Sequence, residues 1–68
     1  MLVLTNLRRL REHAALSQRT LAERAGITAA TIIRAEKGLP MRFLTARRLA
    51  EALGVEPGEL VGSADEPA

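Results

Sequence analysis

The chain has 68 residues, 47% of them hydrophobic, and contains no cysteine. This length allows one small core and leaves little room for a second domain or a deep catalytic cleft. Without cysteine, neither a disulfide framework nor a thiolate metal site can stabilise the fold, so stability must come from aliphatic packing. The apolar start Met1–Leu4 is far shorter than the ~20 residues of a membrane span, and we expect a cytoplasmic protein.

The charges are unevenly distributed along the chain. All ten Lys and Arg residues lie within residues 8–48 beside three Glu residues, which gives this section a net charge of +7. Residues 49–68 contain five acidic residues and no basic one, a net charge of −5. An exposed positive section would attract a polyanion, whereas ordinary solubilising charge on helix surfaces would produce a similar composition.

Apolar residues recur at helical spacing between helix-stopping residues, and this pattern predicts an all-α fold. The first helix is expected at residues 6–15, with an apolar face formed by Leu7, Leu10 and Ala14. The second is expected at residues 17–25, capped by Ser17 and ended by Gly26. Its buried side would consist of Leu21, Ala22 and Ala25.

Three further helices are expected after Gly26. Thr28 caps a helix at residues 28–37 that ends before Gly38. A fourth helix is expected at residues 42–53, and Pro57 opens a fifth at residues 57–61. The inward side chains of the third and fourth helices would be Ile32, Ala35, Phe43, Ala46, Leu49, Ala50 and Leu53, and the short fifth helix would run through Leu60 and Val61. Residues 1–61 would then form the domain, and residues 62–68 a flexible tail.

The segment QRTLAERAGITAATIIRAEK, residues 18–37, resembles the helix-turn-helix unit of the phage-repressor-like (Xre/Cro) family. Ala22 stands where that family needs a small residue, and Gly26 lies in the turn. The family's buried positions are occupied by Leu21, Ala25, Ile27, Ile32 and Ala35. The similarity continues through LRRLRE, LSQ and RRLAEALGVEPGEL, so that it covers about Thr5 to Val61. It implies a compact five-helix, lambda-repressor-like domain that binds double-stranded DNA as a transcriptional regulator, with repression and association with the nucleoid as the expectation.

The same resemblance implies roles for single residues. It places an internal ion pair at Arg11 and Glu36, for which the alternative is two solvated charges. It implies contacts with DNA bases for Ala29, Ala30 and Arg34, and phosphate or mixed contacts for Gln18, Thr28 and Thr31. The sequence departs from the family here, because phage repressors often have glutamine, arginine or serine where this chain has Ala29 and Ala30.

Helical geometry independently predicts the outward face of the third helix. At about 100° per residue, inward Ile32 and Ala35 turn Ala30, Ile33, Arg34 and Lys37 outward. Alanine methyl groups can only contact a thymine methyl, so specificity would depend on Arg34, which can bond one guanine or else a phosphate. Ile33 is either a second methyl contact or an ordinary surface residue. The basic residues expected to contact phosphates beside the helix amino ends are Arg19, Lys37 and Arg42.

One such module buries little surface on DNA, so a homodimer on a two-fold operator is expected. Two apolar groups are candidates for its dimer surface, and either group could instead be core. The first consists of Val55, Leu60 and Val61, and the second of Leu2, Val3 and Leu4.

Other functions are less well supported by the residues. One histidine, His13, and no cysteine leave neither a catalytic set nor a metal or cofactor site. A protein-interaction module on the same fold is the main alternative, since alanines read bases weakly. An antitoxin with an acidic carboxyl end that contacts a basic toxin is another. RNA recognition is disfavoured, because Phe43 is the sole aromatic residue and the pattern turns it inward.

Overall fold

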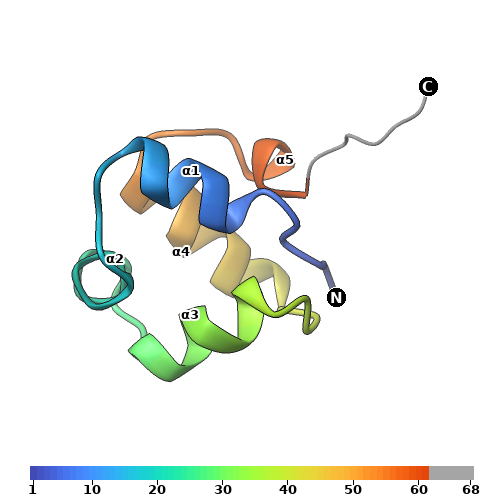
Figure 1. The fold of residues 1–68 in the computed structure, drawn as a ribbon. Helices are drawn as coiled ribbons and strands as arrows, with labels where there is room; N and C mark the ends of the chain where they lie inside the picture. Colours follow the sequence, from blue (N-terminus) through green and yellow to red (C-terminus); the bar gives the residue numbers. More distant parts are fainter. Residues whose placement is uncertain (62–68) are drawn as a thin grey trace.

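The structure is a computed structural model that describes residues 1–61. In this part of the chain the predicted all-α fold is confirmed. The helices are α1 (Leu7–His13), α2 (Gln18–Ala25), α3 (Ala29–Glu36), α4 (Phe43–Leu53) and α5 (Pro57–Leu60). Figure 1 shows α1 crossing in front of α4, with α2 and α3 below and α5 above. The predicted tail, residues 62–68, lies outside the described residues, and none of the helices within residues 1–61 is long and apolar enough to cross a membrane.

The longer helices end in the same backbone motif. At the end of α2, Gly26 has φ +73°, and the backbone N–H of Ile27 donates to the carbonyl of Ala22 at 3.0 Å. This left-handed turn satisfies carbonyls that the helix leaves without partners, and glycine adopts it without a steric penalty. Gly38 and Gly54 also have positive φ after α3 and α4.

The end of α1 has this geometry without a glycine. Ala15 has φ +60°, and the N–H of Leu16 donates to the carbonyl of Arg11 at 3.1 Å. The helix therefore ends at His13 rather than at the predicted residue 15. Ala14 lies past this end and is exposed, so its predicted place on the apolar face was wrong.

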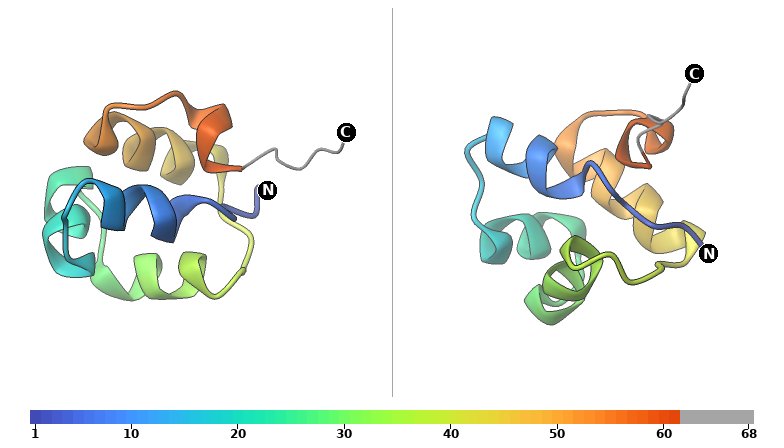
Figure 2. Two further views of the ribbon diagram at one scale, coloured as in Figure 1. Left: turned by 45° about the horizontal axis from the view of Figure 1, so that its top comes forward. Right: turned by 45° about the vertical axis from the view of Figure 1, so that its right-hand side comes forward.

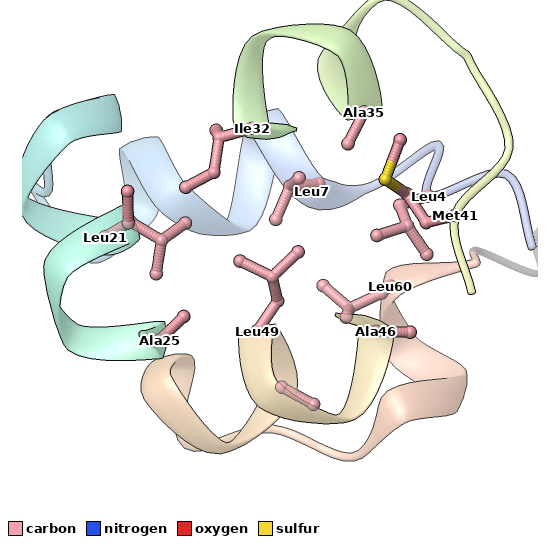
Figure 3. Packing of buried hydrophobic residues seen from close by; sticks show 12 residues of the cluster. Leu4, Leu7, Leu21, Ala25, Ile32, Ala35, Met41, Ala46, Leu49 and Leu60 are labelled. Carbon is pink, nitrogen blue, oxygen red and sulfur yellow. The ribbon is translucent and has the colours of Figure 1, made fainter. Parts of the chain in front are cut away.

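All five helices contribute side chains to one core, shown in Figure 3. Leu7, Leu21, Ile32, Leu49 and Leu60 are the central large side chains, and each is completely buried. Five buried alanines complete the core; they are Ala22, Ala25, Ala35, Ala46 and Ala50. Small residues at these positions let α2 pack against both α3 and α4. The sequence pattern predicted these core positions correctly, except that it left Leu60 open between the core and a dimer surface.

The amino-terminal segment lies between α5 and the α3–α4 connection (Figure 1). Leu2 and Met41 form an isolated antiparallel bridge with backbone N···O distances of 2.7 and 2.6 Å. The bridge positions Leu4 and Met41, which are both buried, against the helices. Leu4 and Leu60 are therefore core residues, which was the stated alternative to a place on a dimer surface.

The position of Phe43 differs from the prediction. Phe43 is 64% exposed, although helical periodicity placed it inward with Ala46 and Leu49. Phe43 is the first residue of α4, and side chains on a helix lean toward its amino end. The ring therefore extends past the end of the core, where no neighbouring helix covers it.

Candidate nucleic-acid interface

The helices α2 and α3 form a tight two-helix unit joined by Gly26, Ile27 and Thr28 (Figure 2). The side chain of Ser17 accepts a hydrogen bond from the backbone N–H of Thr20 at 3.0 Å, which caps α2. The side chain of Thr28 accepts from the N–H of Thr31 at 3.3 Å, which caps α3 in the same way. These caps fix the amino ends of both helices at defined positions relative to the turn.

One face of α3 is buried and the opposite face is free. Ile32 and Ala35 are 0% and 1% exposed and face the core. The exposed side chains of α3 and its two flanking residues are Thr28, Ala30, Ile33, Arg34 and Lys37. Ala29 and Thr31, to which base and phosphate contacts were also assigned, are half-buried, and Thr31 shares its hydroxyl with Thr28 at 2.9 Å. The side chains free to contact a ligand are therefore two methyl-bearing residues and two cations, flanked by one threonine.

The carboxyl end of α3 is tied to α1 by an ion pair whose side chains are largely buried. Arg11 Nε donates to Glu36 Oε2 at 2.6 Å, and Nη2 donates to Oε1 at 3.1 Å. The two side chains are only 11% and 6% exposed. Arg11 Nη1 also donates to the carbonyl of Leu16 at 2.8 Å, so the same guanidinium holds the α1–α2 connection. A bidentate pair of this kind fixes orientation as well as charge.

The ion pair shifts the acid–base equilibria of both partners. Burial acts to raise the pKa of Glu36, but hydrogen bonds from Arg11 and Gln18 and the nearby positive charges of Arg11 and Arg8 together lower it below its ordinary value. The hydrogen bond to Glu36 raises the pKa of Arg11 against the opposing effect of burial. Both groups therefore stay charged at neutral pH.

Gln18 has a role that the sequence did not indicate. Its Nε2 donates to Glu36 Oε1 at 3.0 Å, which joins the first residue of α2 to the last residue of α3. Glutamine is common on helix surfaces, so no signal in the sequence separated this contact from an ordinary exposed side chain. The carbonyl oxygen of the Gln18 side chain takes no part in this bond and is available to a ligand.

An open groove of about 430 Å³ lies beside this network. Besides Arg11, its cationic side chains are Arg8 and Lys37, and Ile33 lies on its wall. The structure thus brings Gln18, Ile33 and Lys37 together around the Arg11–Glu36 pair. Arg34 and Ala30 are exposed elsewhere on α3, and Arg42 is exposed at the start of α4.

Arg19 is less free than Lys37 and Arg34. Its Nε lies 3.6 Å from Glu23 Oε2 one helical turn further along α2, with side chains 87% and 69% exposed. Exposed pairs of this spacing contribute only about 0.3–0.5 kcal/mol, so a phosphate can readily replace Glu23. Among residues 1–61, no cluster of three His, Asp or Glu side chains could hold a metal ion.

Comparison with known proteins agrees with this geometry. The model of a helix-turn-helix family, of the Cro/C1 type and similar to Xre regulators, matches residues 7–60. The matched region includes every helix described above. A comparison with curated proteins finds no match. The chain belongs to the Cro/C1-type helix-turn-helix family of DNA-binding transcription regulators.

Proposed function

We propose that the chain binds double-stranded DNA sequence-specifically by inserting α3 into the major groove. The observation that carries this proposal is the exposed row Ala30, Ile33 and Arg34 on a helix whose opposite face is buried and whose carboxyl end is held by Glu36. The major groove admits an α-helix, and a rigidly held helix presents its outward side chains to base edges without an ordering cost.

Arg34 is the proposed base-specific residue. Its guanidinium can donate two hydrogen bonds to O6 and N7 of one guanine, which contributes about 1–3 kcal/mol of discrimination. Ala30 is exposed and offers only a methyl group, so we assign it close approach and contact with a thymine methyl. Ala29 is half-buried, and we assign it close approach of the helix to the groove. Ile33 extends this apolar row along α3.

The phosphate contacts are assigned to residues around the two helix amino ends. The amino ends of α2 and α3 each begin with a capping residue, and the backbone N–H groups of a helix amino end favour an anion. The side chains assigned to phosphate or mixed contacts are Gln18, Arg19, Thr28, Thr31, Lys37 and Arg42. We propose repression as the outcome, because occupying an operator is enough to block transcription, whereas activation needs a further contact.

Selection of bound duplexes from a random DNA pool at ~150 mM salt tests the proposal. Wild type should select a two-fold motif, and Arg34→Ala should lose the preference for one guanine. Arg24→Ala is the matched control, because Arg24 is also an exposed arginine but lies at the end of α2 beside α4. It should leave the motif unchanged. A flat wild-type profile with steep salt dependence would contradict sequence-specific binding and favour a protein-docking function for the α3 surface.

A further inference from the structure

The open groove beside the Arg11–Glu36 pair, called the α1–α3 groove below, has a positive lining. Its charged side chains are three cations and one carboxylate, a net charge of +2; they are Arg8, Arg11, Lys37 and Glu36. A second open groove, of about 420 Å³ between the end of α2 and α4, is lined by two arginines and two glutamates and has no net charge. The α1–α3 groove therefore attracts an anion, whereas the second groove favours neither sign.

The one carboxylate of the α1–α3 groove is already compensated. Glu36 Oε2 accepts a hydrogen bond from Arg11 at 2.6 Å, and Oε1 accepts from Arg11 and Gln18 at 3.1 and 3.0 Å. The charges of Arg11 and Glu36 thus largely cancel at short range. The net positive charge of the groove comes from Arg8 and Lys37, which are both exposed, and no carboxylate of residues 1–61 pairs with Lys37.

Arg8 is held at the groove by an ion pair that an anion can replace. Its Nε lies 3.2 Å from Glu12 Oε2, one helical turn further along α1, and the two side chains are 70% and 58% exposed. An ion pair this exposed contributes little to stability, so a phosphate oxygen can take the place of Glu12. The charge of Arg8 also contributes to the lowered pKa of Glu36, in agreement with a position beside the groove.

The α1–α3 groove lies next to the proposed DNA-facing surface. Ile33 and Lys37 lie one turn apart on α3, and both line the groove together with Gln18 at the start of α2. The left view of Figure 2 shows α1 and α3 side by side, with α2 at one end of both. A duplex whose bases meet the exposed face of α3 therefore brings a backbone phosphate to this groove.

We propose that the α1–α3 groove holds one phosphate of the DNA backbone and that Arg8 binds this phosphate in exchange for Glu12. Arg8 donates to the phosphate from α1, and Lys37 donates from the end of α3. Glu12 then acts as an internal competitor that lowers the affinity for DNA. This inference rests on the proposed function and extends it, because the contacts proposed above involve only α2, α3 and Arg42.

Salt-dependent binding to the duplex selected from the random pool tests the contact of Arg8. Each phosphate contact contributes about 0.9 to the slope of log K against log salt, so Arg8→Ala should reduce the slope by about 0.9. The advantage of wild type over this variant should then shrink about 3.5-fold between roughly 50 and 200 mM salt. Arg9→Ala is the matched control and should keep the wild-type slope, because Arg9 is exposed on the same helix but does not line the groove. A wild-type slope for Arg8→Ala, or the same reduction in both variants, would overturn the proposal.

The dependence on DNA sequence distinguishes a phosphate contact from a base contact. Arg8→Ala should weaken binding to the selected duplex and to a scrambled duplex by the same factor, because phosphates carry no sequence information. Arg34→Ala should weaken binding to the selected duplex alone. A changed sequence preference in Arg8→Ala would contradict the assignment of Arg8 to a phosphate.

The exchange of partners is tested at Glu12. Glu12→Gln should raise the affinity of wild type for DNA about twofold more than it raises the affinity of Arg8→Ala, which is the effect of an exposed pair of this spacing. Long-range repulsion of DNA by Glu12, and its 4.0 Å contact with Arg11, are present in both backgrounds and cancel in this comparison. Equal gains in the two backgrounds would overturn the exchange. All of these side chains are exposed, so the variants should keep the wild-type melting temperature.

The same titrations separate this inference from the proposed function. If wild type binds no duplex, the proposed function fails and the phosphate contact fails with it. If wild type binds the selected duplex with the dependence on Arg34, while Arg8→Ala keeps the wild-type slope, the contact at the α1–α3 groove fails and sequence-specific DNA binding stands.

Discussion

Replacing Arg11 by methionine should strongly destabilise the domain. Glu36 is 6% exposed and relies on Arg11 for two of its three side-chain hydrogen bonds. Removing one partner of a buried ion pair leaves an uncompensated charge, which costs about 3–5 kcal/mol. A domain of this size has a total stability of about 3–5 kcal/mol, so Arg11→Met should be largely unfolded at 25 °C. Urea unfolding at low temperature with a stabilising osmolyte, followed by circular dichroism, measures the loss.

The pH dependence of stability gives a second test of the same variant, because its sign should differ between Arg11→Met and wild type. In wild type the pKa of Glu36 is lowered from its ordinary value of 4.5. Its stabilising contribution is therefore present above pH 4.5 and is lost as pH falls through the folded-state pKa. In Arg11→Met, burial is the largest influence on this pKa and is opposed only by the hydrogen bond from Gln18 and the charge of Arg8. The pKa should therefore rise, and the stability of the variant should increase as the pH falls from neutral.

A double variant serves as the control for this prediction. Arg11→Met/Glu36→Gln removes both charges and keeps an acceptor for Gln18, so it should recover most of the lost stability. An exposed ion pair contributes at most about 1 kcal/mol. If Arg11→Met loses less stability than this and keeps the pH profile of wild type, Glu36 is not a buried charge that Arg11 compensates.

Three further changes test other parts of the account. Ala15→Gly should stabilise the domain by up to about 1 kcal/mol in urea unfolding, because alanine at φ +60° is strained and glycine is not; a loss of stability would contradict this. Ala22→Leu should destabilise by about 1–3 kcal/mol, since Ala22 is 3% exposed where α2 packs on its neighbours; thermal melting that matches wild type would show that the contact is loose. If one domain neutralises ~4 phosphates, log K should fall with log salt at a slope near −3.6, and Lys37→Ala should reduce the slope by about 0.9; an unchanged slope in anisotropy titrations would remove Lys37 from the phosphate contacts.

Sequence patterns predicted the features of the fold that depend on residues close together in the chain. Gly26, Gly38 and Gly54 marked three helix ends because each has a positive φ that glycine adopts readily. The end of α1 was predicted too late because Ala15 adopts the same backbone conformation without the residue type that signals it. Spacing along α3 also predicted which of its residues are buried and which are exposed.

Features that depend on tertiary contacts were not predictable in this way. Leu4 and Met41 are core residues on segments without helical periodicity, and only their proximity to the helices buries them. Phe43 has the periodicity of a buried residue but lies beyond the end of the core. The hydrogen bond from Gln18 to Glu36 joins two helices through residues that lie eighteen positions apart in the sequence. No local sequence pattern specifies such a contact.

The most direct test of the central claim, that α3 and its neighbours contact DNA, is an NMR titration of isotope-labelled protein with its selected duplex. We predict that the largest backbone shifts occur at the amino end of α2, along the exposed face of α3 and at Arg42. Arg24, Arg48 and Glu51, which line a groove between the end of α2 and α4, should stay unchanged. Shifts concentrated around Arg24, Arg48 and Glu51, with α3 unaffected, would contradict the claim.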